Sequence, residues 1–210
     1  MDFLPKGRLD AFADGVFAIV ITLLVLDLSI PSVTENLMPA LVDQWPVFLA
    51  YIISFAFVGS VWISHSSITA LMKQETPHSY RLTLLMLLFV SLIPFTTKLM
   101  AFYLSNPPAM PENIGSDLFS WWVTVNTLAR SALSAPVTIY GLDLLAASVT
   151  LNGIMKSAMI TPDVLLNESA EDELNALQKR QKFGIIVIIV TLICGFFLPV
   201  VAVIGYIFTS

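Results

Sequence analysis

The sequence predicts an all-α integral membrane protein with six transmembrane helices. Three observations lead to this fold class. Apolar residues make up 57% of the 210 residues and charged residues only 12%. The mean hydropathy of +0.84 is far above that of a water-soluble domain. Uncharged stretches recur along the chain, among them 46–72 and 183–210, and such lengths suffice to cross a hydrocarbon core about 30 Å thick.

The composition also excludes other classes of protein. A single cysteine, Cys194, rules out an intrachain disulfide framework and a cysteine-rich metal site. The net charge of -5 does not indicate an acidic surface for a partner, because the position of Lys and Arg decides how a membrane protein is oriented. We expect no cleavable signal peptide, since Asp14 and Asp27 interrupt the first apolar run. We also expect no cofactor, no fixed metal and no nucleic-acid partner.

The first predicted span covers 11–30 and ends before Pro31. It lies in the stretch RLDAFADGVFAIVITLLVLDLSI, which carries acids at Asp14 and Asp27. A helix would separate these carboxylates by roughly 20 Å, so both lie near the edges of a bilayer core. An apolar helix bracketed by acids is more than a plain anchor.

Two further spans follow. The second, 47–72, comes after a loop at 32–45, contains no Asp, Glu, Lys or Arg, and begins next to Trp45, which suits the membrane interface. A polar turn at 73–81 separates it from the third span, 82–104. The stretch 105–116 is predicted to be a loop because of its Pro, Asn and Gly residues.

The next part of the chain alternates between polar and apolar stretches. Residues 117–133 contain Trp121, Trp122 and Arg130 and predict an interfacial helix, with a membrane-embedded segment as the alternative. A fourth span, 134–156, carries Asp143 near its middle. The stretch 163–182 is acidic early and basic late, which is typical of an exposed helix, and we expect it in the cytoplasm.

The last uncharged stretch allows two readings. It is either one kinked helix or a hairpin of two short spans, 183–197 and 198–210. The hairpin is favoured, because Pro199 cannot donate the usual helix hydrogen bond. With the N-terminus in the cytoplasm, this six-helix reading returns the C-terminus to the same side. All Lys and Arg residues except Lys98 and Arg130 then lie in the cytoplasm, as the positive-inside rule favours.

The first helix presents a stripe with heptad spacing. Such a stripe can meet copies of itself, and its small and hydroxyl-bearing members favour helix association in a bilayer. The alternative is that these residues pack inside one subunit. The stripe consists of Phe12, Gly15, Ile19, Thr22, Leu26 and Ser29, with Leu23 beside it.

Asp14 lies away from this stripe, about 120 degrees or more from Ile19 around the helix. Its expected neighbours are Arg8 and His65. An ionisable residue within a span is a functional hypothesis, but a carboxylate in the first turn also interacts with free backbone N–H groups and the helix dipole. We favour a structural clamp over direct contact with an ion.

Several of these residues resemble the bacterial members of the TMEM175 potassium-channel family. The first helix of that family begins Arg-x-x-x-Phe-Ser-Asp and continues with GVFAI and ITLLVL. Arg8, Phe12 and Asp14 match, while Ala13 replaces the serine. Trp62 and His65 resemble the Trp-x-x-His of its second helix. LLFVSLIPF at 87–95 and YGLDLL at 140–145 are similar to its third and fourth helices, with Asp143 in place of the more usual Asn.

The resemblance implies a homotetrameric channel that conducts potassium and lacks the TVGYG filter. It also implies that this channel lies in a bacterial inner membrane. The first helix would line the pore, with Ile19 as an apolar constriction and Thr22, Leu23 and Leu26 nearby. Four Ile19 side chains would seal the path by dewetting, and four Thr22 hydroxyls would replace part of a cation's water shell.

The resemblance also implies roles for residues outside the constriction. Asp27 would concentrate cations at the outer mouth, its alternative being a solvated carboxylate at a helix end. A structural polar network would hold the first helix in place. Its members would be Arg8, Phe12, Asp14, Trp62 and His65.

Two other classes of function fit the sequence less well. A secondary transporter would use Asp14, His65 and Asp143 as a proton relay, but no internal repeat is visible. A membrane enzyme would need a converging catalytic group, and the chain has neither HExxH nor GxSxG. We therefore expect no enzyme.

Overall fold

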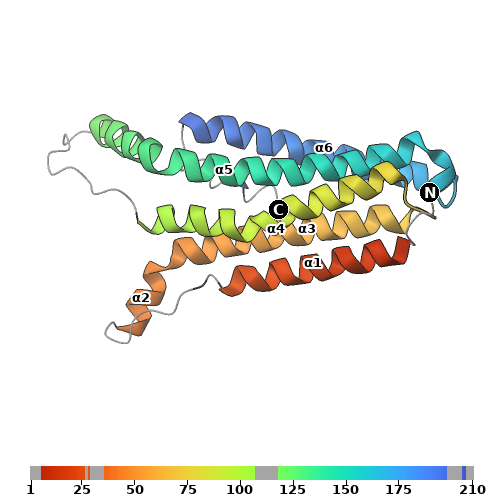
Figure 1. The fold of residues 1–210 in the computed structure, drawn as a ribbon. Helices are drawn as coiled ribbons and strands as arrows, with labels where there is room; N and C mark the ends of the chain where they lie inside the picture. The colour runs from red at the N-terminus through yellow and green to blue at the C-terminus, as the bar shows by residue number, and fades with distance from the viewer. Residues whose placement is uncertain (1–5, 27, 29–35, 107–117, 198–204, 207–210) are drawn as a thin grey trace.

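A computed structural model of the chain describes residues 6–26, 28, 36–106, 118–197 and 205–206. Its long helices lie side by side, and successive ones run in opposite directions (Figure 1). We call the end of the bundle where α1 begins the Lys6 end and the opposite end the Leu26 end. The elements in chain order are α1 (Lys6–Leu26), α2 (Leu37–Asp43), α3 (Trp45–Ala70), α4 (Pro77–Ser105), α5 (Leu118–Ile160), the 3-10 helix η1 (Pro162–Val164) and α6 (Glu168–Phe197).

Among the described residues, four helical segments are long and apolar enough to cross a bilayer, namely α1, α3, α4 and Ser134–Ile160 of α5. In α6 only the second half, from Phe183 to Phe197, lacks charged residues, and 15 residues rise only about 22 Å. The prediction of an all-α, multi-pass membrane protein is confirmed. The count of six spans stays a prediction.

Two pairs of elements that the sequence separates are continuous in the structure. The interfacial helix at 117–133 and the span at 134–156 form the single helix α5, and the helix at 163–182 runs directly into 183–197 as α6. A change in polarity does not end a helix unless the backbone is interrupted as well. Pro136 lies inside α5 and removes one backbone hydrogen bond, which accounts for the bend in its first part (Figure 1).

The loop expected at 32–45 was wrong in part, because α2 occupies Leu37–Asp43. Asn36 precedes this helix in an extended conformation. Pro39 lies in the first turn. Backbone N–H groups there have no partner within the helix, so a proline costs no hydrogen bond. The proline that favours a loop in the sequence is therefore compatible with the start of a short helix.

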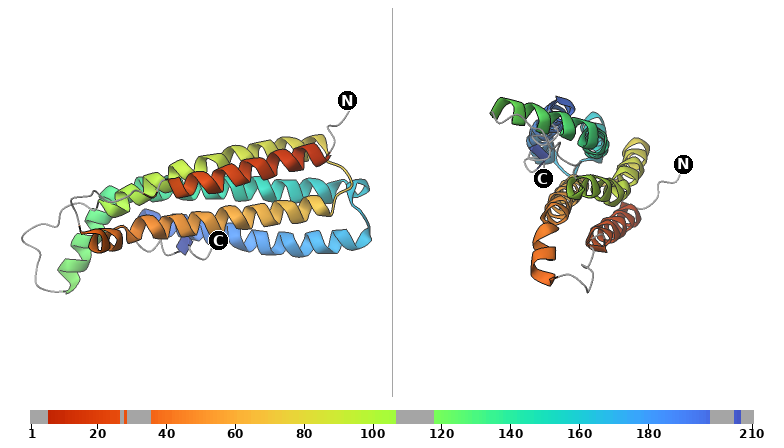
Figure 2. Two further views of the ribbon diagram at one scale, coloured as in Figure 1. Left: turned by 90° about the horizontal axis from the view of Figure 1, so that it is seen from below. Right: turned by 90° about the vertical axis from the view of Figure 1, so that its left-hand side faces the viewer.

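Helix α1 lies at one edge of the bundle and α6 at the opposite edge (Figure 2). α1 packs against α3 and α4, whereas α6 packs against α5. The buried residues of α1 recur every three or four positions, so that one face of the helix enters the core. They are Leu9, Ala13, Phe17, Val20 and Leu24.

Hydroxyl groups join α3, α4 and α5 inside the apolar core. Ser54 Oγ lies 2.7 Å from Thr97 Oγ1 and 2.9 Å from the Tyr140 hydroxyl. Tyr206 donates a hydrogen bond of 3.0 Å to the carbonyl of Val137, and its ring meets that of Tyr140 edge-on. These bonds satisfy polar groups that would otherwise be costly to bury in the core.

The last described residues fold back onto the bundle. A Cβ atom at Gly205 would lie 2.7 Å from Thr191 Oγ1. A continuous helix would separate residues 191 and 205 by about 21 Å, so residues 205–206 do not lie on a continuation of α6 but beside it. The span predicted at 198–210 lies mostly outside the described residues and stays a prediction.

Backbone and side-chain hydrogen bonds close the Lys6 end. The Lys6 ammonium donates to the carbonyls of Thr69 and Met72, the latter at 2.6 Å, where a cation is favourable at the C-terminus of α3. The turn after α3 is also joined to η1, because the Lys73 amide donates to the Val164 carbonyl at 2.7 Å. The start of α1 is thereby joined to both turns at this end.

Glu75 lies in the turn between α3 and α4 and is only 6% exposed. One carboxylate oxygen accepts a hydrogen bond from the Ser79 hydroxyl, and the other is buried without a partner. Burial raises the pKa of Glu75 above its ordinary value of 4.5, and the Ser79 hydrogen bond opposes this increase. Folding therefore shifts the proton equilibrium of Glu75 toward the protonated form, relative to the unfolded chain.

We expect the Glu75→Gln variant to change how stability depends on pH. In the wild type the unfolded chain loses this proton near pH 4.5, before the folded chain does. The free energy of unfolding should therefore fall as pH rises from that value through the folded-state pKa. The variant has no such proton to lose. Its free energy of unfolding, relative to that of the wild type, should therefore rise with pH over this range. Thermal unfolding of purified protein across the range measures it, and a constant difference would contradict the assignment.

Candidate functional site

The stripe predicted on α1 is exposed in the subunit from Phe12 to Leu26, while its last member, Ser29, lies outside the described residues. Ile19 is 60% exposed and Leu26 75%, and Phe12, Gly15, Thr22 and Leu23 are exposed as well. The opposite face of the same helix is buried against α3 and α4. A membrane helix with one packed face leaves the other to lipid or to another subunit.

Thr22 uses its hydroxyl proton within α1. The hydroxyl donates to the carbonyl of Ile19 at 2.8 Å. A hydroxyl group also has two acceptor lone pairs, and these are left for another partner once the proton is committed. Thr22 therefore presents an oxygen rather than a donor on the exposed face.

Asp14 is held by α3. Its Oδ1 accepts a hydrogen bond of 2.9 Å from the indole N–H of Trp62. His65, one helical turn further along α3, is 2% exposed, and its ring centroid lies 6.3 Å from that of Phe17. The structure thus brings together three of the residues assigned to the polar network.

Arg8 and Phe12 lie on another side of α1. They line a cleft of about 300 Å³ together with Leu9, Tyr80 and Leu84, where α1 meets α4. Asp14 instead lines a cleft of about 280 Å³ between α1 and α3. The predicted polar network is therefore divided between the two neighbours of α1.

Sequence reasoning missed two residues of the cleft between α1 and α3. Lys6 and Asp10 line it with Asp14 and His65. The signal was present, because Lys6, Asp10 and Asp14 follow at intervals of four residues and therefore share one face of a helix.

Asp143 belongs to a different cluster. It is 7% exposed and lies on α5, where the hydroxyl of Thr96 donates to its Oδ2 at 2.9 Å. Asp14 and His65 lie together in the cleft between α1 and α3. The transporter reading requires a relay through all three residues, and the cleft that holds Asp14 and His65 does not include Asp143.

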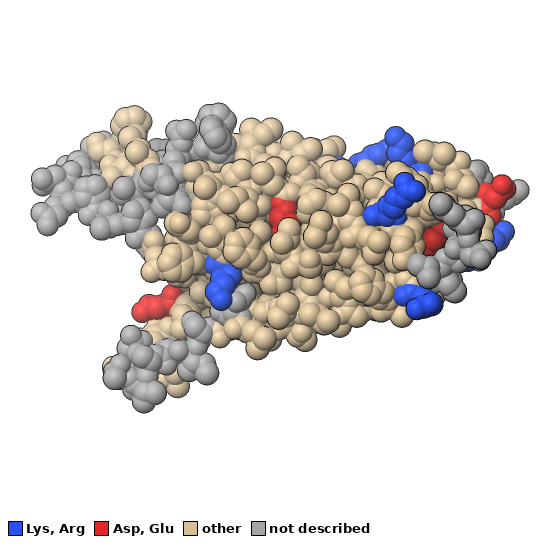
Figure 3. Space-filling view, viewed as in Figure 1, with Lys and Arg blue, Asp and Glu red and all other residues tan. Residues whose placement is uncertain are grey.

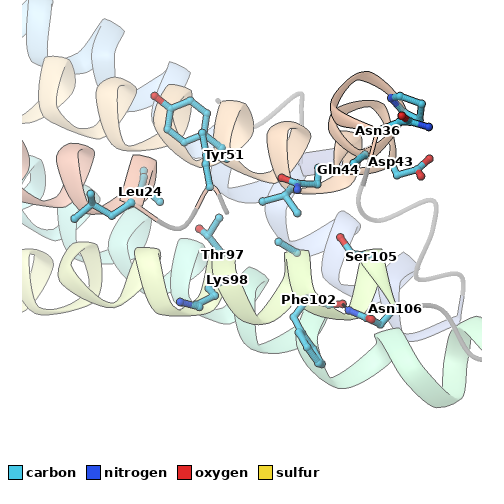
Figure 4. Close-up of a pocket in the computed structure, with 16 residues that line it drawn as sticks. Leu24, Asn36, Asp43, Gln44, Tyr51, Thr97, Lys98, Phe102, Ser105 and Asn106 are labelled. Atoms are coloured by element: carbon cyan, nitrogen blue, oxygen red, sulfur yellow. Dashed lines mark hydrogen bonds between the residues drawn. The ribbon is translucent and has the colours of Figure 1, made fainter. Parts of the chain in front are cut away.

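A larger groove of about 960 Å³ opens at the Leu26 end (Figure 4). Leu24 and Leu26 of α1 line it, together with residues of α2, α3 and α4. Tyr51 of α3 lies across from Thr97 and Lys98 of α4 in this view. Asp27, predicted at the outer mouth, lies outside the described residues.

On the face of the bundle shown in Figure 3, charged side chains gather toward the ends, above all at the Lys6 end, and few lie in its middle. Within the part of the chain that the structure describes, no three His, Cys, Asp or Glu side chains are placed to bind a metal ion directly.

Comparisons with known proteins agree with the resemblance. Residues 8–94 match the family described as endosomal/lysosomal potassium channel TMEM175. A potassium channel of Chamaesiphon minutus is 32% identical over 182 residues, which cover 85% of this chain and 78% of that protein. The human endosomal/lysosomal proton channel TMEM175 is 40% identical over 101 residues, covering 43% of this chain but 20% of that protein.

The same fold is present in a solved structure. The crystal structure of a lysosomal potassium-selective channel TMEM175 homolog from Chamaesiphon minutus superposes with a TM-score of 0.74 and 29% identity. The alignment covers 97% of this chain and 93% of that one. A multi-pass helical protein of this fold falls in the class of ion channels, not of enzymes. The chain belongs to the TMEM175 family.

Proposed function

We propose that the chain is one subunit of a homotetrameric, potassium-preferring cation channel whose central pore is lined by α1. The observation that carries this proposal is the exposed stripe of α1, which holds Ile19 and Thr22 on a helix packed on its other face only. Two bacterial relatives, of Chamaesiphon minutus and Streptomyces collinus, are named potassium channels.

The proposed pore combines an apolar ring with a ring of oxygens. Four Ile19 side chains around an axis have no polar atom to replace an ion's hydration shell, so a narrow ring there is a barrier. The Thr22 hydroxyl lies one turn further along α1. Because its proton is donated to the Ile19 carbonyl, its lone pairs remain available to a cation.

The groove at the Leu26 end extends this proposal. In the tetramer we place it beside the outer mouth, since it is lined by the last turn of α1. Asp27 would concentrate cations there. Leu26 and Leu23 would narrow the path between this mouth and Thr22.

Potassium flux through purified protein in liposomes tests the proposed function. A channel lets potassium run down its gradient, whether or not a pH gradient is present. A secondary transporter would instead accumulate potassium against its gradient when protons flow inward. Parallel assays with sodium and with a pH-sensitive dye measure the preference among cations, and uphill accumulation would contradict the channel.

We further propose that the protein lies in a bacterial inner membrane with both termini in the cytoplasm. This orientation leaves only Lys98 and Arg130 outside. Single cysteines at positions 2 and 210, in a variant without Cys194, should be protected from an impermeant reagent on intact cells and should react after lysis. Labelling of either position on intact cells would contradict the orientation.

A further inference from the structure

The cleft between α1 and α3 gathers more negative than positive charge. Asp10 and Asp14 are one helical turn apart on the same face of α1, and like charges at this spacing repel each other. Lys6 is the cation of the cleft, but its ammonium already donates to the carbonyls of Thr69 and Met72. The two carboxylates therefore have one nearby lysine between them, and its ammonium already donates hydrogen bonds to backbone carbonyls.

Polar atoms in this cleft lack partners among the described residues. Asp10 Oδ1 is buried without a hydrogen bond, and so is Nε2 of His65. His65 is 2% exposed and lines the same cleft. One carboxylate oxygen of Asp14 accepts the hydrogen bond from Trp62, and its second oxygen is left for another partner. A ligand that donates several hydrogen bonds and carries positive charge would satisfy all three side chains.

The size and composition of the cleft narrow the class of cation. No three acidic, His or Cys side chains of the described residues converge on one point, which disfavours an ion bound by direct protein ligands. A volume of about 280 Å³ holds roughly nine waters at about 30 Å³ each. Magnesium loses its water reluctantly and is held in proteins through one or two carboxylates while keeping several waters.

We propose that this cleft binds one hydrated divalent cation of the magnesium type, held by Asp10, Asp14 and His65 through its water ligands. The bound ion neutralises the two carboxylates of α1, and its waters donate to the unpartnered oxygen of Asp10 and to His65 Nε2. It thereby fastens the first turns of α1 to the last turns of α3. This inference does not depend on the proposed pore, since it concerns the opposite side of α1 from Ile19.

Thermal unfolding of the purified full-length protein, at constant ionic strength, tests the site. Magnesium should raise the Tm in a saturable way. Hexaamminecobalt(III), which mimics hydrated magnesium and cannot exchange its ligands, should do the same. Asp10→Asn should weaken the apparent affinity at least about tenfold, as expected for the loss of one hydrogen bond to a charged group. Asp172→Asn, the same change at an exposed position of α6, is the matched control and should leave the affinity unchanged.

Three results would overturn the proposal. These are an equal rise in Tm from sodium, an unchanged affinity in Asp10→Asn, and no effect of hexaamminecobalt(III). A second measurement needs no variant. Manganese(II), a paramagnetic substitute for magnesium, should bind to the wild type at one ion per chain and be displaced by magnesium in electron paramagnetic resonance spectra. Absence of bound manganese would equally refute the site.

Discussion

Replacing Ile19 with alanine should increase the cation current carried by each assembled channel. The side chain is 60% exposed on the stripe of α1, so it contributes little to the packing of its own subunit. In the proposed pore it forms the apolar barrier, and truncation widens the ring. Ile19→Asn also adds a polar group that holds water, so it should change the discrimination among monovalent cations as well. A barrier lowered by about 1.4 kcal/mol would raise the current about tenfold.

A matched control is available on α6. Ile186 is 58% exposed, nearly the same as Ile19, but belongs to α6, the helix at the opposite edge of the bundle from α1 (Figure 2). Ile186→Ala should leave the current unchanged. The measurement is current per assembled channel in planar bilayers under a potassium gradient. If both Ile19 variants assemble and conduct no better than the wild type, Ile19 does not form the constriction.

Removing Asp14 should destabilise the assembled protein rather than merely alter conduction. The Trp62 N–H donates to its carboxylate at 2.9 Å and joins α1 to α3. A hydrogen bond to a charged group contributes about 1.5–3 kcal/mol. Asp14→Ala and Trp62→Phe should each lower the thermal stability and the yield of assembled protein. In a double-mutant cycle their effects should be less than additive, by about the energy of that bond.

The exposed acid Asp172 again serves as the control for this experiment. Asp172→Ala removes a carboxylate of the same size from an exposed position on α6 and should change stability little. Additive effects of Asp14→Ala and Trp62→Phe would show that the hydrogen bond contributes nothing. Normal assembly of Asp14→Ala with altered conduction would place Asp14 in the ion path instead.

Several predictions from sequence hold because they rest on local pattern. The resemblance carried by Arg8, Phe12, Asp14, Trp62 and His65 is confirmed by family membership. The bounds of α3 lie close to Asp43 and Lys73, where uncharged sequence begins and ends, as the bilayer requires. The polar turn predicted at 73–81 was wrong in part, because α4 already begins at Pro77, where a proline suits the first turn of a helix. Where polarity changes without a backbone break, as between 163–182 and 183–197, the same reasoning divided a continuous helix.

The assignments to α1 show the limit of periodicity. The heptad spacing of Phe12, Ile19 and Leu26 indicated a shared face, but it left open whether that face packs inside one subunit. The tertiary structure shows that this face is exposed, because α3 and α4 pack against the opposite face of α1. The roles of Ile19, Thr22, Leu23 and Leu26 in the pore and of Asp27 at its mouth remain predictions.

By itself, the sequence determined that this is an all-α membrane protein of the TMEM175 family, because hydropathy and a long local motif suffice for both. The tertiary structure decided which side chains of α1 meet which neighbour. Arg8 meets α4 and Asp14 meets α3, and the latter contact also creates the cleft that Lys6, Asp10 and His65 share. The physical reason is that hydropathy determines whether a helix enters the bilayer, whereas its rotation within the bundle depends on side-chain packing and hydrogen bonds between residues far apart in the chain.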